Sequence, residues 1–407
     1  MLPPRRRVKH RAAARPDRPA LPDELVLNIL ERVAAPEPDE TPRTHKLRRQ
    51  TLVALCRLAK RFVADVKRKL YVRVTLRLVL SRNVERGSVQ FVLAREPYLR
   101  KVVKAVHLAG NPAAVDDPSV RELLGGLVNV EDMSVGDLGV AAIEVLRAMP
   151  ARQLCRLQAP TGYQVVKLLD MRRARAILSG VTHLSLTYDV AGLSPALVYL
   201  PSLQTLVVCG TTFVGPGLEQ LAESTNAVRQ QLVSIRVPIR AFGWWAYNLS
   251  IYDNLTHFTL GIDAVTAQSL DEVIPRIVRS LESLARSANL QSLTLEGCVE
   301  SWRDRTPDGR RTGRLLATQD DIPRSTNDIL LAVPPQIRSL SLLTPCLRTD
   351  DVARYLLGPS RPPHLDTLRA GDRLGRSLRK MLDGGVGPFR ALARELERAG
   401  ITVRFVE

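Results

Sequence analysis

Two histidines, His183 and His257, are the residues of this sequence with the clearest potential for chemistry. They occupy the same position in two similar short segments, so both side chains can face the same side of a sheet. Neither is accompanied by a carboxylate or a cysteine in a catalytic motif, and a metal site needs more ligands at fixed spacing. The sequence also lacks GxSxG, HExxH and a glycine-rich phosphate loop, and GGVG at 384–387 is expected to be an ordinary loop. We therefore expect a protein that is not an enzyme, with no catalytic residue, no metal site and no cofactor.

The five cysteines indicate a compartment rather than a reaction. They form no CxxC pair, and their odd number, without a recognisable secretory signal, fits buried thiols in a reducing compartment. We therefore predict a cytoplasmic or nuclear protein. No segment approaches the roughly 18 consecutive apolar residues of a membrane span, so no membrane partner is expected.

The elements that would position the histidines are clearest in Leu290 to Cys298, LQSLTLEGC, which has the form LxxLxLxxC. Side chains alternate along a strand, so Leu293 and Leu295, at the fourth and sixth places, face the same way. The asparagine or cysteine at the ninth place can hydrogen-bond backbone groups as the chain turns away. The segment that returns must then cover the leucines. This pattern is one unit of a leucine-rich repeat.

Ten such units follow one another at steps of about 22 to 29 residues, with longer steps of about 35 and 47, close to the period of this repeat. Helix-like segments lie between them, such as 271–288, where Pro275 is expected in the first turn. We predict an α/β fold in which strand–helix units form a solenoid with a curved parallel sheet. The alternative is a set of ordinary strands in another kind of α/β protein. The fourth-place residues are Val106, Met133, Leu157, Leu184, Leu206, Ile235, Phe258, Leu293, Leu340 and Leu368.

The third and fifth places of each unit point away from the leucines and form the concave face of the predicted sheet. They hold serine and threonine with scattered histidine and arginine, which suits hydrogen bonding to another protein. The other interpretation is that exposed strand positions are simply rich in such residues. The residues expected to contact a bound protein, whose identity is unknown, are His107, Arg156, His183, Thr205, Arg236, His257, Thr294 and Arg369.

The N-terminal quarter differs in composition from the repeats. Residues 1–20 are rich in arginine, alanine and proline and are expected to be a disordered basic tail. Residues 21–75 predict three short helices, too few to bury a good core, so part of their apolar surface should contact a partner or cap the first repeat. Residues 1–77 carry about +12 of the net charge of +18. The repeats are therefore nearly balanced, and nucleic acid is an unlikely partner for them.

The N-terminal helices resemble an F-box. In that family the motif binds a Skp-type adaptor, which links it to a cullin scaffold and a RING subunit, and the repeats behind it select proteins for ubiquitination. The chain is similar to F-box proteins of the fungal type with C-terminal leucine-rich repeats. The residues that carry the resemblance are Leu21-Pro22-Asp23-Glu24-Leu25 with Ile29-Leu30, then Leu55 to Phe62, then Leu70-Tyr71. The resemblance implies adaptor contacts at Leu21, Pro22, Leu25, Ile29, Leu30, Leu52, Leu55, Cys56 and Phe62.

The expected organisation is a basic tail (1–20), an F-box-like helical domain (21–75) and a solenoid (76–407) with an insertion at 301–328. The resemblance implies the substrate-recognition subunit of a Skp–cullin–F-box ubiquitin ligase, with no catalytic residue of its own. The alternative is a leucine-rich-repeat scaffold with no ligase role. Binding of the adaptor separates these two hypotheses.

Overall fold

The structure is a computed structural model that describes most of the repeat region and a few N-terminal positions. Of the nine residues predicted to contact the adaptor, all except Leu52 lie outside the described residues. Almost all of the insertion at 301–328 lies outside them as well. The described ranges are 63–135, 141–150, 154–161, 172–189, 200–208, 231–238, 252–262, 267–297, 325–344, 347–384 and 388–406, with positions 32–33, 47, 50–54, 138, 165 and 167.

The chain divides into two compact units, Met1–Val72 and Arg73–Glu407. In the first unit the described residues include helical positions at 50–54 and the helix α3 (Val63–Leu70). The second unit contains all of the described strands, beginning at Arg73.

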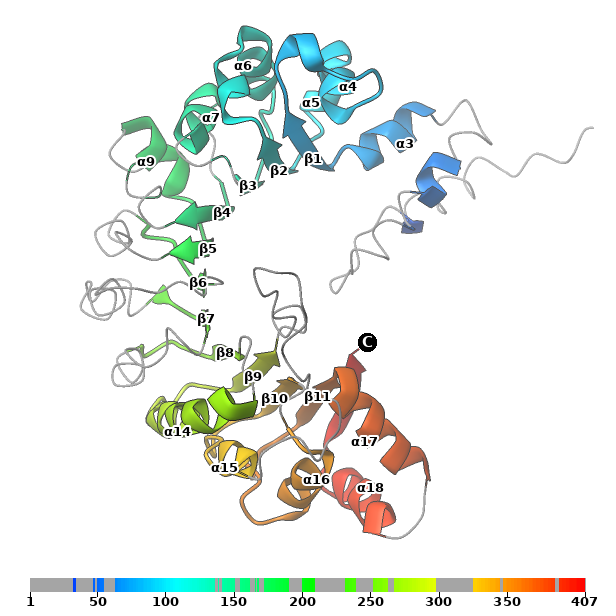
Figure 1. Ribbon diagram of the computed structural model, residues 1–407, viewed down its shortest axis with the longest axis vertical. Helices are drawn as coiled ribbons and strands as arrows, with labels where there is room; N and C mark the ends of the chain where they lie inside the picture. Colours follow the sequence, from blue (N-terminus) through cyan, green and yellow to red (C-terminus); the bar gives the residue numbers. More distant parts are fainter. Residues whose placement is uncertain are drawn as a thin grey trace, which may run out of the picture. The chain divides into compact units, whose positions relative to one another are not determined.

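Twelve strands in the described part of the second unit form one parallel sheet in which spatial order equals sequence order. They lie along the inner side of this unit, as Figure 1 shows. This topology is what a series of strand–helix units requires, because each unit pairs only with its neighbours. The strands are β1 (Arg73–Leu78), β2 (Ala105–Gly110), β3 (Asp132–Ser134), β4 (Arg156–Thr161), β5 (His183–Asp189), β6 (Thr205–Val208), β7 (Ser234–Pro238), β8 (His257–Ile262), β9 (Ser292–Gly297), β10 (Ser339–Leu343), β11 (Thr367–Gly371) and β12 (Thr402–Val406).

The register of the sheet follows the repeat. All ten predicted units form strands, and their fourth-place residues are paired with one another from strand to strand, so the predicted solenoid with a curved parallel sheet is confirmed. Two strands extend the series, β1 at the start and β12 at the end. The aligned residues, in strand order, are Val74, Val106, Met133, Leu157, Leu184, Leu206, Ile235, Phe258, Leu293, Leu340, Leu368 and Val403.

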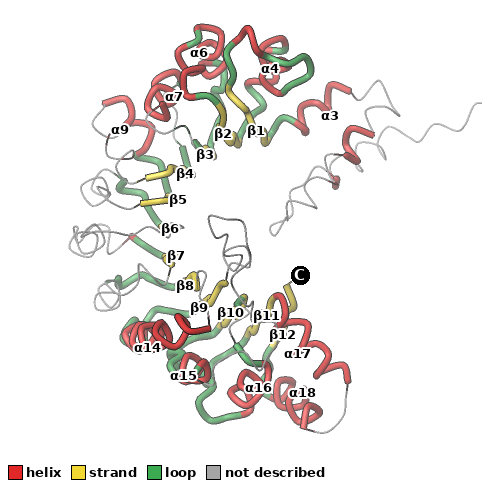
Figure 2. The backbone as a smooth tube through the Cα atoms, in the orientation of Figure 1, coloured by secondary structure: helices red, strands yellow, loops and turns green. Residues whose placement is uncertain are grey.

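Helices cover the outer side of the sheet in the second unit (Figure 2). The longest, α14, directs Ile277, Leu281 and Leu284 into the core, and all three are fully buried. Burying one such side chain contributes about 1.5–3 kcal/mol. The helices are α4 (Val89–Arg95), α5 (Pro97–Arg100), α6 (Pro118–Gly125), α7 (Ala142–Ala148), α9 (Arg172–Leu178), α14 (Ala267–Leu284), α15 (Thr326–Leu331), α16 (Thr349–Leu357), α17 (Asp372–Gly384) and α18 (Pro388–Arg398), with 3-10 turns η2 (Ser81–Asn83) and η3 (Pro112–Asp116).

Three expectations need correction. The helix α14 begins at Ala267 rather than at residue 271, so Pro275 lies inside the helix and not in its first turn. The proline removes one backbone hydrogen bond inside the helix, and the residues that follow it, Ile277, Leu281 and Leu284, are buried against the core. The thiol of Cys155 is exposed rather than buried, because the residue precedes β4 at the second place of its unit, outside the leucine rows.

The helix α15 starts at Thr326, within the stretch expected to be an insertion.

The turn after β2 shows how the ninth place works. The side chain of Asn111 accepts a hydrogen bond from the backbone N–H of Ala113 (3.0 Å). The backbone N–H of Asn111 donates to the carbonyl of Leu78 on β1 (2.9 Å). Gly110, just before it, has φ of +116°, and a Cβ there would lie 2.4 Å from the same carbonyl oxygen. Only glycine fits this close approach. The expected hydrogen-bonding role of the ninth place is confirmed at Asn111.

Asp117 connects two turns near the start of the sheet. Its carboxylate accepts hydrogen bonds from the backbone N–H of Ser81 (2.8 Å) and from that of Ser119 (3.0 Å), where it caps α6. The bond from Ser81 and those from Ser119 hold the pKa of the Asp117 carboxyl well below its usual range.

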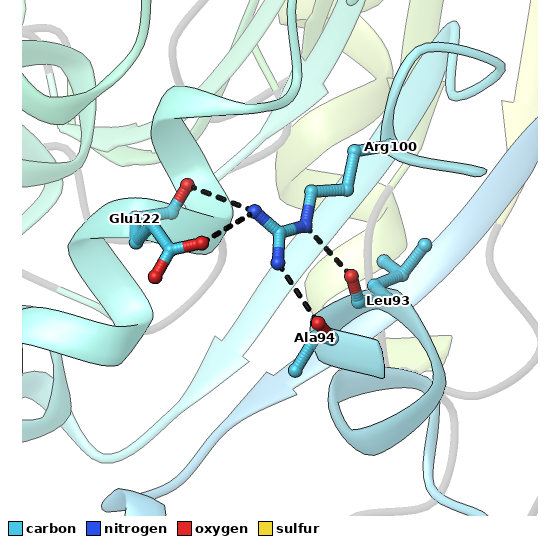
Figure 3. A network of polar contacts seen from close by, with 4 residues as sticks. All are labelled: Leu93, Ala94, Arg100 and Glu122. Carbon is cyan, nitrogen blue, oxygen red and sulfur yellow. Dashed lines mark hydrogen bonds and ion pairs between the residues drawn. The ribbon is translucent and has the colours of Figure 1, made fainter. Parts of the chain in front are cut away.

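Arg100 joins α4 to α6 in the first repeats (Figure 3). Only 7% of the residue is exposed. Its Nε donates to the carbonyl of Leu93 (2.7 Å) and its Nη2 to that of Ala94 (3.0 Å), two acceptors at the end of α4. Its Nη1 contacts the side chain of Glu122 on α6 at 3.1 Å. A single buried guanidinium thus satisfies carbonyls that the end of a helix leaves without partners.

Candidate interaction surface

The concave face of the sheet is formed by the third and fifth places of the repeat, which alternate with the buried leucine rows. The structure places all eight predicted contact residues on the described strands and on this one face. His107, Arg156 and His257 are exposed, and the other five are half-buried. The strands that position them are β2, β4, β5, β6, β7, β8, β9 and β11.

The register brings some of these residues together and keeps others apart. Arg156, His183 and Thr205 are direct neighbours in the third row, on β4, β5 and β6. His257 lies in the same row on β8, three strand spacings from His183, which is about 14 Å. In the fifth row, Arg369 on β11 is aligned with Arg404 on β12. The face is therefore a long row of contact points rather than one compact centre.

An ion pair that the sequence reasoning missed crosses the middle of this face. Nη2 of Arg236 on β7 lies 2.9 Å from Oε2 of Glu296 on β9, so the two side chains reach each other across β8. Glu296 occupies the seventh place of its unit, whereas the predicted contacts come from the third and fifth places. Both side chains are partly exposed, at 41% and 35%, and such pairs contribute about 0–1 kcal/mol to stability. The pair fixes the direction of Arg236 more than it stabilises the fold.

The three histidines of the face each hydrogen-bond a hydroxyl through Nδ1. His107 contacts Ser134 on the next strand at 2.8 Å. His183 and His257 each contact the threonine that precedes them, at 2.8 Å and 2.6 Å. Burial lowers the pKa of the His183 imidazole, the charge of Arg156 lowers it further, and the charge of Asp132 opposes both. The pKa of His183 therefore lies below that of a free imidazole.

The described part of the face carries more positive than negative charge, although the repeat region as a whole is nearly balanced. Six arginines lie at outward-facing strand positions, against two acidic side chains, of which Glu296 is engaged by Arg236. The arginines are Arg73, Arg77, Arg156, Arg236, Arg369 and Arg404, and the acidic residues are Asp132 and Glu296.

The chemistry available here is hydrogen bonding and charge. Among the residues that the structure describes, no group of three or more His, Cys, Asp and Glu side chains could hold a metal ion. Over the same residues, none of the helices combines the length and the apolar character needed to cross a membrane.

One predicted adaptor contact falls among the described residues. Leu52 lies in a helical segment of the first unit and its side chain is only 1% exposed. Two other large apolar side chains nearby, Leu47 and Val53, are 53% and 42% exposed. Neither was among the predicted contacts, because Leu47 precedes the apolar stripe of the predicted helical segment 47–74 and Val53 lies outside that stripe.

Comparison with known proteins gives fold similarity alone. No family model matches the sequence, and no curated protein matches it. A leucine-rich-repeat-containing protein from Legionella pneumophila is similar in structure, with a TM-score of 0.42 and 14% identity, over 82% of this chain and 90% of that one. A protein from Bacteroides fragilis matches with a TM-score of 0.25 and 12% identity, over 82% of this chain and 73% of that one. The repeat character of the present chain rests on its own sheet, in which the fourth-place residues of successive units are in register.

Proposed function

We propose that this chain is the substrate-recognition subunit of a Skp–cullin–F-box ubiquitin ligase. The observation that carries the proposal is the order of two features along one chain. An F-box-like segment, beginning with Leu21-Pro22-Asp23-Glu24-Leu25, precedes a repeat sheet whose exposed rows are polar and basic. The first feature resembles an adaptor-binding motif, and the second offers a long surface for another protein.

The proposed mechanism is geometric. The N-terminal helices dock on a Skp-type adaptor, and the concave face holds the protein that is to be ubiquitinated. The sheet is packed and parallel, so the bound protein is kept at a defined place relative to the ubiquitin donor. Proximity alone raises the rate of transfer, because it converts an encounter in solution into a reaction within one assembly. The chain itself supplies no nucleophile, acid or base in this proposal.

One observation favours a second candidate, a leucine-rich-repeat scaffold without a ligase role. Leu52, which the resemblance assigns to the adaptor interface, is buried within the protein. A buried leucine is expected where N-terminal helices pack to cap a repeat array, which a solenoid requires at its ends. In that case the exposed Leu47 and Val53 would remain as ordinary surface residues.

Adaptor binding decides between the two candidates. The full-length chain and a Leu25→Asp, Ile29→Asp double variant are incubated with purified Skp-type adaptor and recovered by pull-down. Leu331→Asp serves as a matched control, since Leu331 is a 52% exposed apolar residue of α15 in the repeat region. The proposal predicts that the wild type and the control bind and that the double variant does not, with unchanged circular dichroism. Absence of binding by the folded wild type would support the scaffold instead.

A further inference from the structure

The strand β12 has an edge that is incompletely covered. Among the described strands it pairs with β11 alone (Figure 2). The fourth-place residues of the other described strands are all buried, with at most 5% of each exposed. Val403, the fourth-place residue of β12, is only half-buried, and so is Phe405 at the sixth place. The apolar row of the core therefore reaches the surface at this edge.

The strand β1, at the other end of the series, is covered. Its core-facing residues Val74, Leu76 and Leu78 are at most 5% exposed, and α4 packs against the strand. Incomplete cover is therefore particular to β12 and does not follow simply from a position at the end of the series.

The open side of β12 also presents backbone groups. The N–H of Thr402 donates to the carbonyl of Asp366, the residue before β11, at 2.8 Å. Successive residues of a strand direct their backbone groups to alternate sides, so those of Arg404 also face β11. The N–H and C=O groups of Val403 and Phe405 then face the open side, as at any sheet edge. The strand, TVRFV, contains no proline or glycine that would prevent further pairing.

Positive charge surrounds this edge. The strands β10, β11 and β12 contain two arginines and no acidic residue. Arg404 is exposed on the concave side of β12, where it is aligned with Arg369 on β11. The guanidinium of Arg379 on α17 lies 4.8 Å from the centre of the Phe405 ring. Like charges in aligned positions destabilise a sheet, so a carboxylate beside Arg404 would offset its repulsion with Arg369.

We propose that the open edge of β12 binds an extended segment of a partner protein, which adds a further strand to the sheet. The segment pairs with the outward backbone groups of Val403 and Phe405, the usual basis of strand addition. Its side chains alternate in type. An aspartate or glutamate lies beside Arg404 on the concave side, and the apolar residues that flank it cover Val403 and Phe405.

This inference goes beyond the proposed function. The site belongs to the second compact unit and uses none of the predicted adaptor residues, so it does not depend on the ligase role.

A partner with a carboxylate fits this edge better than a second copy of the chain does. Two copies that paired all five residues of β12 would run antiparallel about the middle residue, Arg404. That residue would then lie opposite Arg404 of the second copy, and like charges in this arrangement oppose pairing. A strand with an acidic residue at this position replaces the repulsion by an attraction.

Hydrogen exchange tests whether the edge is open. Deuterium uptake of the full-length chain is followed by mass spectrometry, with fragmentation that resolves single amides. We expect the amides of Val403 and Phe405 to exchange at least about tenfold faster than that of Arg404, which faces β11. Equal rates at the three amides would overturn the proposal, because the strand would then be either covered on both sides or unpaired on both.

Recognition is tested with a displayed library of nine-residue peptides selected on the full-length wild type. Enriched peptides should carry an acidic residue between apolar residues at alternate positions. Adding a selected peptide should slow the exchange of the Val403 and Phe405 amides. No enrichment of such peptides contradicts the proposal.

A charge exchange tests the contact with Arg404. In Arg404→Glu the affinity for a selected peptide should fall about tenfold, because an attraction becomes a repulsion. Replacing the acidic residue of the peptide by lysine should restore binding to this variant. Arg77→Glu, the same change at an exposed arginine on the concave side of β1, should leave the affinity unchanged. Equal binding to wild type and Arg404→Glu contradicts the proposal.

A second variant isolates the backbone contact. Val403→Pro removes an N–H that faces the open side and leaves the bonds to β11 in place, which an edge strand tolerates. Val403→Thr keeps this N–H and the branched side chain and serves as the control. Binding should be lost in the first variant and kept in the second, with unchanged circular dichroism. Binding by a folded Val403→Pro contradicts the proposal, and the charge exchange at Arg404 decides the matter if this variant does not fold. Adaptor binding tests the ligase role separately.

Discussion

Replacing Arg100 by methionine should destabilise the first repeats strongly. The guanidinium is almost fully buried and donates to the carbonyls of Leu93 and Ala94 at 2.7 and 3.0 Å. Hydrogen bonds to a charged group contribute about 1.5–3 kcal/mol each, and methionine keeps the apolar stem while leaving both acceptors unsatisfied. We expect the free energy of unfolding to fall by about 3 kcal/mol.

Glu122→Gln provides the control for this prediction. The Glu122 side chain is 75% exposed, so its ion pair with Arg100 is screened by water and contributes about 0–1 kcal/mol. We therefore expect a loss below about 1 kcal/mol for this variant. The comparison separates the capping of α4 by the guanidinium from the attraction between the two charges.

Urea titrations followed by circular dichroism give the stability of each variant, provided that the slope of the transition is unchanged. Terminal repeats can also open locally, so amide hydrogen exchange in α4 and α6 should be measured alongside. Faster exchange in Arg100→Met, confined to these helices, is the expected pattern. Equal effects of Arg100→Met and Glu122→Gln would show that the carbonyl contacts do not stabilise this region.

Four other substitutions, one of them a control, test the packing and the hydrogen bonds of the repeats. Gly126→Ala should cost about 1–3 kcal/mol in urea titrations, because its Cβ would lie 2.5 Å from Cδ of Arg100. Asp117→Asn should lower stability at pH 7. Because the pKa of Asp117 is depressed on folding, its contribution is complete above the unfolded value of about 3.9 and is lost as the pH falls below it, so the two proteins should converge in acid. Leu293→Ala should cost about 2–5 kcal/mol, whereas Ser292→Ala on the opposite face should change stability by less than about 0.5 kcal/mol; similar losses for both would contradict the assigned faces.

The repeat could be read from the sequence because its leucine spacing has a direct structural cause. Leu293 and Leu295 face the core only if the strand runs through both, and the same spacing fixes the register with Phe258 and Leu340. Alternation then assigns the neighbouring residues to the concave face. Each inference uses spacing alone, which a single sequence contains.

The last strand, β12, was not predicted from the leucine spacing, and the cause is local. Val403 aligns with the other fourth-place residues, but Gly400 stands at the first place, where the ten predicted units have an aliphatic residue. Gly400 has φ of +69° and ends the turn after α18, so backbone conformation determines this position. A pattern based on apolar residues does not detect such a unit.

Contacts between distant residues could not be predicted in the same way. The pair of Arg236 with Glu296 joins the fifth place of one unit to the seventh place of the unit two strands away. The contacts of the His183 and His257 rings with the hydroxyls of Thr182 and Thr256 depend on side-chain directions. These features require the register of neighbouring strands or the directions of side chains, which spacing within one unit does not contain.

The central claim is that the F-box-like segment connects this repeat protein to a ligase. Size-exclusion chromatography with light scattering, on the purified full-length chain mixed with purified Skp-type adaptor, tests it most directly. The account predicts one complex with the summed mass of one copy of each protein, which Leu25→Asp with Ile29→Asp abolishes. Two separate peaks from a folded wild-type chain would contradict the ligase role and favour a repeat scaffold.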